Sequence, residues 1–309
     1  MPKTSPDHHT VNLILKKFLP DDALVKVVQL KGGVSHHVSS ITTKTNSGKQ
    51  RVLILKCYEG FDWKDSNIHS SRREFEILDF LIEKGLRVPK PYFFDNSLDI
   101  LSSPYTLIDF IEGDTQSELD SFPKRISNMA MFLAALHKIS TKDLMHLQVE
   151  NLESPLEGCF KFLPRVKGIE NYAELIQKLK SFTLHKNSKL VLNHGDFWPN
   201  NIIWKNEEVA GVIDWEDISL GDPMADLATA RIELFCMYGR EVTESFSLKY
   251  LNESKFETKN LPIWEIYAAA AAIATMDSWE LNQQQKTERL HATTVYLANT
   301  IKEFCRDQD

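Results

Sequence analysis

The chain has 309 residues, 42% of them hydrophobic and 26% charged, a composition typical of a globular protein with a sizeable core. Its polar N-terminus and short hydrophobic runs predict neither a secretion signal nor a membrane-spanning helix, so we expect a cytoplasmic protein without membrane partners. The net charge is −7, and residues 191–309 alone carry 20 acidic against 10 basic residues. This acidic half disfavours nucleic acid as a partner and mildly favours a cationic substrate, although a solvated acidic surface explains it equally well.

The first third of the chain predicts an antiparallel sheet accompanied by two helices. The expected strands cover residues 25–30, 38–45, 51–58, 92–94 and 105–111. The expected helices cover residues 11–19 and 70–84, and Gly85 is placed to end the second one. This part therefore reads as β-rich.

Beyond Gly113 the pattern becomes mostly helical. The expected helices cover residues 122–139, 170–182, 222–237, 262–280 and 283–305. A tight hairpin interrupts them, with an apolar strand over 202–204, a polar turn over 205–208 and a return strand over 209–213. We therefore predict an α+β, two-lobed fold. Its parts are a nucleotide-binding N-terminal lobe over 1–108, a hinge over 109–113 and a mainly helical catalytic lobe over 114–309.

Three polar residues flank the predicted hairpin. Asp196 and Asn201 precede its first strand, and Asp214 follows its second. Because antiparallel strands of matched length bring their outer ends together, we expect Asp214 to lie beside Asn201 and near Asp196. A carboxylate that accepts a hydroxyl proton, together with oxygen ligands for Mg²⁺, is what phosphoryl transfer requires.

The same segment resembles the aminoglycoside phosphotransferase and choline kinase family, the small-molecule relatives of the protein kinases. The motif H-G-D-x-x-x-x-N is matched by residues 194–201, the metal-binding I-D by residues 213–214, and G-D-P-x-x-D-L by residues 221–227. The resemblance covers most of residues 30–230. It implies a protein-kinase-like two-lobed fold that uses ATP, with GTP left open, and Mg²⁺.

The resemblance also implies a role for each residue of the site. Asp196 is expected to be the catalytic base, with Asn201 and Asp214 as Mg²⁺ ligands. The expected nucleotide-binding residues are Lys56, its orienting partner Glu74, Gly33, Ser35, Asp109 and Ile111. Glu76 is a rival of Glu74, but two positions along a helix it points in another direction.

The late helix carries candidate substrate residues. Asp277 and Glu280 are three positions apart on the predicted helix 262–280, so they would share a face and repel each other. A bound cation would relieve that repulsion, and Trp279 lies between the two acids. Unpaired surface acids explain the same residues.

These observations predict an ATP-dependent phosphotransferase that moves the γ-phosphate to a hydroxyl of a small molecule, such as a cationic aminoglycoside-like or choline-like compound. Only eight residues separate Asp214 from Pro223, too few for the activation segment on which peptide substrates dock. The identity of the substrate and the oligomeric state stay open. Two alternatives are a nucleotide-binding regulatory module without turnover and a metal-dependent hydrolase.

Overall fold

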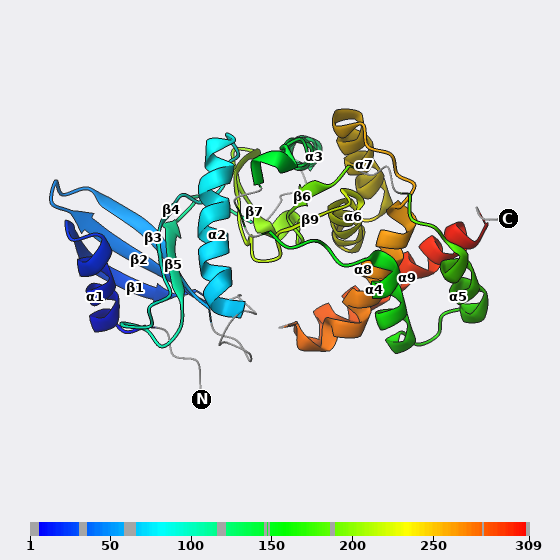
Figure 1. Ribbon diagram of the computed structural model, residues 1–309, viewed down its shortest axis with the longest axis horizontal. Helices are drawn as coiled ribbons and strands as arrows, with labels where there is room; N and C mark the ends of the chain where they lie inside the picture. The colour runs from blue at the N-terminus through cyan, green and yellow to red at the C-terminus, as the bar shows by residue number, and fades with distance from the viewer. Residues whose placement is uncertain are drawn as a thin grey trace. The chain divides into compact units, whose positions relative to one another are not determined.

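The computed structural model describes residues 6–30, 36–58, 66–115, 122–144, 147, 149–185, 189–279 and 281–306 (Figure 1). The chain divides into two compact units. The N-terminal unit comprises Met1–Gly113 and Ala210–Glu216, and the C-terminal unit comprises Asp114–Val209 and Asp217–Asp309. Sequence analysis assigned all of 114–309 to one lobe, whereas the segment that carries Asp214 packs with the N-terminal unit.

The N-terminal unit contains a five-stranded antiparallel sheet with the strand order β1-β2-β3-β5-β4. The strands are β1 (Asp22–Gln29), β2 (His37–Thr45), β3 (Gln50–Cys57), β4 (Pro91–Asp95) and β5 (Tyr105–Asp109). Each strand expected from the sequence is present, and the last one ends two residues earlier than expected, at Asp109. The antiparallel, β-rich character of this part is confirmed.

Two helices cover opposite faces of this sheet (Figure 1). Leu53 and Leu55 of β3 pack in one core with Ile14 of α1 (His8–Phe18). Lys56, the next residue along the strand, faces the other side and contacts Glu74 of α2 (Ser66–Glu83). The alternation of side chains along β3 thus separates an apolar face under α1 from a charged one under α2.

Glycine ends α2 as the sequence predicted. Gly85 has a φ of 80°, and its N–H donates to the carbonyl of Ile82 while the N–H of Leu86 donates to that of Leu81. These two bonds form a Schellman motif, which requires a left-handed residue that glycine adopts without strain.

The predicted hairpin is formed by β7 (Ile202–Lys205) and β8 (Glu208–Val212). Asn206 and Glu207 join the strands with φ angles of 50° and 64°, as in a type I′ turn. The end of β8 is fixed within the N-terminal unit, because the N–H of Val212 donates to the carbonyl of Arg87 at 2.9 Å. Gly211 lies so close to the Ile111 side chain that a Cβ there would overlap it.

The C-terminal unit is mainly helical. Its α-helices are α3 (Phe122–His137), α4 (Pro155–Phe162), α5 (Tyr172–Ser181), α6 (Met224–Tyr238), α7 (Arg240–Ser254), α8 (Leu261–Thr275) and α9 (Gln283–Arg306). Two short strands, β6 (Val191–Asn193) and β9 (Ser219–Gly221), pair antiparallel. No helix in the described part of the chain is long and apolar enough to cross a bilayer.

Sequence analysis missed α4 and α7 and placed the end of α8 too late. The buried face of α7 includes Thr243 and Ser247 beside Phe246 and Tyr250, so its polar members weaken the apolar period. The α-helical part of α8 ends at Thr275 and is followed by a 3₁₀ turn over Met276–Ser278. The helix expected over 262–280 is therefore present, but its predicted end is wrong.

Candidate active site

The loop that carries Asp196 is held by a buried carboxylate. Asp226, in the first turn of α6, is fully buried and accepts the N–H groups of His194 at 2.7 Å and Gly195 at 2.8 Å. His137 of α3 lies with its Nε2 3.1 Å from the same carboxylate. Burial raises the pKa of Asp226, but His137 and the charge and N–H of His194 outweigh it and hold the pKa below its ordinary value. Asp226 thus stays ionised and fixes the backbone of the loop.

Asp196 and Asn201 lie in contact at the start of the hairpin. The Asn201 amide nitrogen donates to the Asp196 backbone carbonyl and to its Oδ2, each at 2.9 Å. Gly195 has a φ of 88°, and a Cβ there would overlap the Asp217 carbonyl, so only glycine suits this position. The amide nitrogen of Asn201 is turned to Asp196, which leaves the amide oxygen as the atom able to bind a cation.

Lys56 lies at the centre of an ion cluster in the N-terminal unit. Its Nζ is 3.0 Å from Glu74 Oε2, 3.2 Å from Asp214 Oδ1 and 3.3 Å from Glu216 Oε2. Tyr58 donates its hydroxyl to the Glu74 carboxylate. Burial by itself lowers the pKa of Lys56, but Glu74 and the other acidic groups around it raise it well above its ordinary value. The lysine is therefore a fixed positive charge on the sheet.

Glu216 is a member of this cluster that sequence reasoning missed. Its Oε2 is 2.8 Å from His36 Nε2, and its backbone carbonyl accepts from Arg73 at 3.1 Å. The signal was present, because Glu216 is the next acid after Asp214 in the same short segment. The rival of Glu74, Glu76, instead forms an ion pair with Arg72 on the surface of α2.

The remaining expected nucleotide-binding residues differ in how far the structure describes them. Gly33 and Ser35 lie outside the described residues. Asp109 donates its N–H to the carbonyl of Lys90 at 2.8 Å and accepts the Tyr92 hydroxyl at 2.7 Å. Its N–H is thus already used within the N-terminal unit.

Asp196 lines a cavity of about 390 Å³ within the C-terminal unit. Asp226 and Glu233 of α6 line it as well, and one face of α8 forms a wall. Trp279 also lines the cavity, whereas Asp277 is exposed and forms an ion pair with Lys286. Glu280 lies outside the described residues. The α-helix itself ends at Thr275, and Asp277 lies in the 3₁₀ turn that follows it.

An arginine of α9 adjoins this cavity and was not expected from the sequence. The guanidinium of Arg289 contacts the Glu233 carboxylate and lies 5.6 Å from the ring centroid of Trp198 and 5.3 Å from that of Trp279. Trp198 belongs to the Asp196 loop, so Arg289 connects that loop with the cavity wall. No local pattern predicts this contact, because Glu233 and Trp198 lie 56 and 91 residues before Arg289 in the chain.

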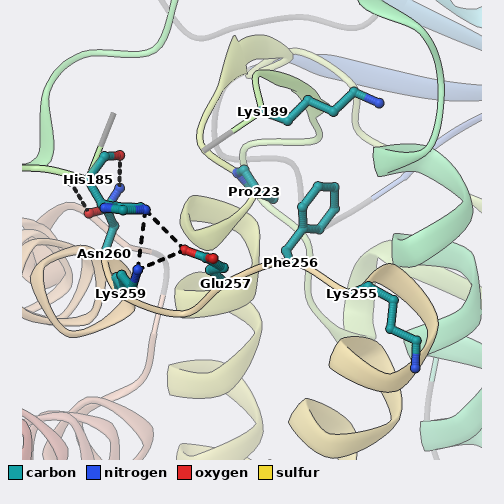
Figure 2. A pocket seen from close by; sticks show the side chains of 8 residues that line it. All are labelled: His185, Lys189, Pro223, Lys255, Phe256, Glu257, Lys259 and Asn260. Atoms are coloured by element: carbon teal, nitrogen blue, oxygen red, sulfur yellow. Dashed lines mark hydrogen bonds and ion pairs between the residues drawn. The ribbon is translucent and has the colours of Figure 1, made fainter. Parts of the chain in front are cut away.

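A second, smaller cavity of about 160 Å³ in the C-terminal unit has a structural role (Figure 2). In Figure 2, dashed lines join Glu257 to His185 and to Lys259, with which it is ion-paired at 3.0 and 3.2 Å. Asn260 donates to Asp222 Oδ2 at 2.6 Å, and Asp222 Oδ1 accepts the N–H of Met224 at 3.0 Å. These contacts brace the start of α6, so Asp222 is a buried structural residue.

The fold and the residues of the site define a protein-kinase-like small-molecule phosphotransferase. An antiparallel β-rich unit carries a buried lysine–glutamate pair, and a mainly helical unit carries an anchored H-G-D loop. Residues 26–257, about three quarters of the chain, match the Phosphotransferase enzyme family (APH), and the chain belongs to this family.

Two solved structures share this fold. An aminoglycoside 2′-phosphotransferase-IIIa solved as its GDP complex has a TM-score of 0.65 at 15% identity, with 94% of this chain and 98% of that chain covered. The choline kinase LicA from Streptococcus pneumoniae has a TM-score of 0.63 at 20% identity, with 94% and 98% covered. At these identities the likeness concerns the fold alone.

A curated relative is a much longer protein. Acyl-CoA dehydrogenase family member 10 of Mus musculus is 24% identical over 228 residues, which is 68% of this chain and 21% of that protein. The chain thus spans about a fifth of the relative's length.

Proposed function

We propose that this protein is an ATP-dependent phosphotransferase that moves the γ-phosphate to a hydroxyl group of a small molecule. The observation that best supports this proposal is the way in which Asp196 is held at the cavity. Its loop is held by the buried carboxylate of Asp226, its side chain is oriented by Asn201, and it lines a cavity of about 390 Å³. That volume is within the range of small-molecule sites.

In this proposal Lys56 binds the α- and β-phosphates of the nucleotide. Glu74 holds the Lys56 ammonium in place. Because the pair is buried, water screens the positive charge of the lysine only weakly, and the charge interacts strongly with a phosphate beside it. The backbone of Asp109 and Ile111 contacts adenine. Gly33 and Ser35 are proposed to cover the phosphates, as the resemblance implies.

Asn201 and Asp214 are the proposed ligands of Mg²⁺. Both supply oxygen, the ligand that Mg²⁺ prefers, and one or two protein ligands suffice when phosphates and water complete the shell. The described residues contain no group of three or more histidine, cysteine or acidic side chains that could hold a metal ion by themselves. When bound, the ion neutralises charge on the phosphates.

Asp196 then accepts the proton of the substrate hydroxyl. The hydroxyl oxygen forms a bond to the γ-phosphorus, the bond from that phosphorus to the bridging oxygen breaks, and ADP leaves with the bonding electrons. Asn201 keeps the Asp196 carboxylate turned toward the substrate by donating to its Oδ2.

The variant Asp196→Asn tests this assignment. We expect phosphorylation of an accepted substrate to fall about 10²- to 10⁴-fold, because an amide cannot accept the proton, while nucleotide affinity changes little. The control Asp277→Asn removes an exposed acid that does not line the cavity, and turnover should persist. Full turnover by Asp196→Asn would refute the proposed base. Nucleotide binding with no ATP consumption for any hydroxyl compound would favour a regulatory module.

A further inference from the structure

The cavity beside Asp196 has a smooth apolar wall. It is formed by six residues on one face of α8: Trp264, Tyr267, Ala268, Ala271, Ala272 and Thr275. Their spacing of three and four residues places them in one stripe along the helix. Ala269 and Ala270 lie on the opposite face, buried in the core of the unit. The alanines of the stripe thus give the cavity an apolar wall of small side chains.

The same wall contains an unsatisfied donor. Trp264 is only 4% exposed, and its indole N–H has no hydrogen-bond partner in the described part of the chain. This nitrogen is itself closed off from the cavity, so a bound molecule contacts the apolar ring of Trp264 and not its N–H.

Four acidic residues line the cavity: Asp196, which is the proposed base, Asp217, Asp226 and Glu233. Two of them, Asp226 and Glu233, are already committed to partners within the protein. The Asp226 carboxylate accepts two backbone N–H groups and contacts His137. Glu233 is ion-paired with Arg289. These two acids are thus neutralised before a substrate arrives, so they offer little attraction to a positively charged one.

Arg289 occupies an aromatic cage beside the cavity. Two indole rings and a carboxylate, from Trp198, Trp279 and Glu233, surround its guanidinium. Such aromatic cages bind quaternary ammonium ligands when they are open. Burial lowers the pKa of Arg289, but Glu233 and Asp196 raise it above its ordinary value, so the arginine stays charged and paired with Glu233 and leaves no place in the cage for a second cation.

We propose that the hydroxyl substrate has an uncharged aliphatic body that lies along the alanine face of α8, because this wall of the cavity is apolar and Arg289 already occupies the aromatic cage beside it. This inference rests on the proposed function. It replaces the cationic substrate, which the acidic composition mildly favours, with an uncharged one. The hydroxyl end lies at Asp196, and the chain contacts Ala268, Ala271 and Ala272.

Binding of matched alcohols to the full chain without nucleotide tests the charge preference. Choline and 3,3-dimethylbutan-1-ol have the same shape and differ in charge, and calorimetry or ligand-observed NMR gives their affinities. We expect the neutral compound to bind at least about tenfold more tightly. Equal or tighter binding of choline would overturn the proposal.

A linear series from 1-butanol to 1-octanol tests the apolar wall. The affinity for the alcohol should rise about fourfold for each added methylene until the cavity is full. Ala271→Leu should reduce binding of the longer alcohols about tenfold or more, whereas Ala274→Leu, on the same helix but outside the cavity, should not. A flat series in the wild-type protein would refute the inference irrespective of how the variants fold.

Emptying the cage gives the converse test. Arg289→Met should increase choline binding about tenfold or more, since Glu233 and the two tryptophans become available. The double variant Arg289→Met with Glu233→Gln should lose that gain, and thermal unfolding checks that both are folded. No gain in the folded single variant would contradict the assigned cage. Because these measurements omit nucleotide, a failure of the proposed phosphotransfer in Asp196→Asn stays distinct from a failure here.

Discussion

At the scale of single residues, the site depends on charges that are buried and paired. Asp226 has no exposure to solvent and binds the loop backbone on one side and His137 on the other. His137 in turn contacts the Tyr250 hydroxyl at 2.7 Å. A buried carboxylate is tolerated only with such partners, so the arrangement stabilises one conformation of the Asp196 loop.

Asp226→Asn should therefore impair both folding and turnover. The amide replaces an acceptor with a donor that faces backbone N–H groups, and we expect a loss of about 3 kcal/mol in the free energy of unfolding. Urea denaturation and steady-state kinetics measure the two effects. Asp277→Asn is the matched control, and an unchanged stability of Asp226→Asn would show that the carboxylate does not hold the loop.

Lys56→Met tests the ion cluster of the sheet. Removing the ammonium leaves the carboxylates of Glu74, Asp214 and Glu216 near one another without a cation, so affinity for ATP should fall about tenfold or more. Calorimetry with Mg²⁺–ATP measures the change. Lys44→Met removes an exposed lysine of β2 and should leave affinity as it is. If both variants bind alike, Lys56 does not contact phosphate.

At the scale of elements, polar contacts join helices to strands. The periodicity of the sequence predicts each helix and strand but not the contacts between them. Asp95 at the end of β4 accepts from Lys17 of α1 at 2.7 Å and from the Tyr105 hydroxyl of β5 at 2.9 Å. The strands themselves were predictable because apolar and polar residues alternate along them. The partners of Asp95 were not predictable, because β1, β2, β3 and α2 lie between α1 and β4 in the chain.

The contacts of Asp95 predict acid sensitivity. Burial raises its pKa, but hydrogen bonds from Lys17, Ser97 and Tyr105 outweigh it and lower the pKa from 3.8 to about 2. A carboxyl with a lowered folded pKa stabilises the protein above its unfolded pKa and loses that contribution as pH falls from about 4 to about 2. Asp95→Asn should thus be less stable by on the order of 2 kcal/mol at pH 7, with the difference vanishing near pH 2.

Urea denaturation of both proteins across this pH range provides the check. Asp79→Asn serves as the control, because Asp79 is an exposed acid of α2. A constant difference between wild type and Asp95→Asn down to pH 2 would show that the carboxylate is not the group that titrates.

At the scale of the whole molecule, one short segment unites distant parts of the sequence. Ala210–Glu216 follows 96 residues of the C-terminal unit and yet completes the N-terminal unit, to which it supplies Asp214 and Glu216. The charge cluster around Lys56 consequently requires residues 158 and 160 positions further along the chain. The N-terminal unit cannot assemble its proposed nucleotide site until the chain has been made beyond Glu216.

Nucleotide and metal should therefore stabilise the folded chain together. A ligand at about 100 times its dissociation constant adds about 2.7 kcal/mol, and we expect ATP to raise the unfolding temperature with Mg²⁺ but far less with excess EDTA. Asp214→Asn should lose most of the Mg²⁺-dependent part. Thermal unfolding in the two buffers measures this, and an equal effect of ATP with and without the metal would argue against the proposed ligands.

The sequence by itself determined the antiparallel strands, the presence of the hairpin and the H-G-D, I-D and G-D-P segments, because each is encoded by neighbouring residues and a short period. The tertiary structure decided which side chains meet. It paired Asp226 with His137, added Glu216 to the lysine cluster, filled the cage of Trp198 and Trp279 with Arg289, and buried the partly polar face of α7. These contacts join residues far apart in the chain, and their energies depend on burial, which arises only when the elements pack.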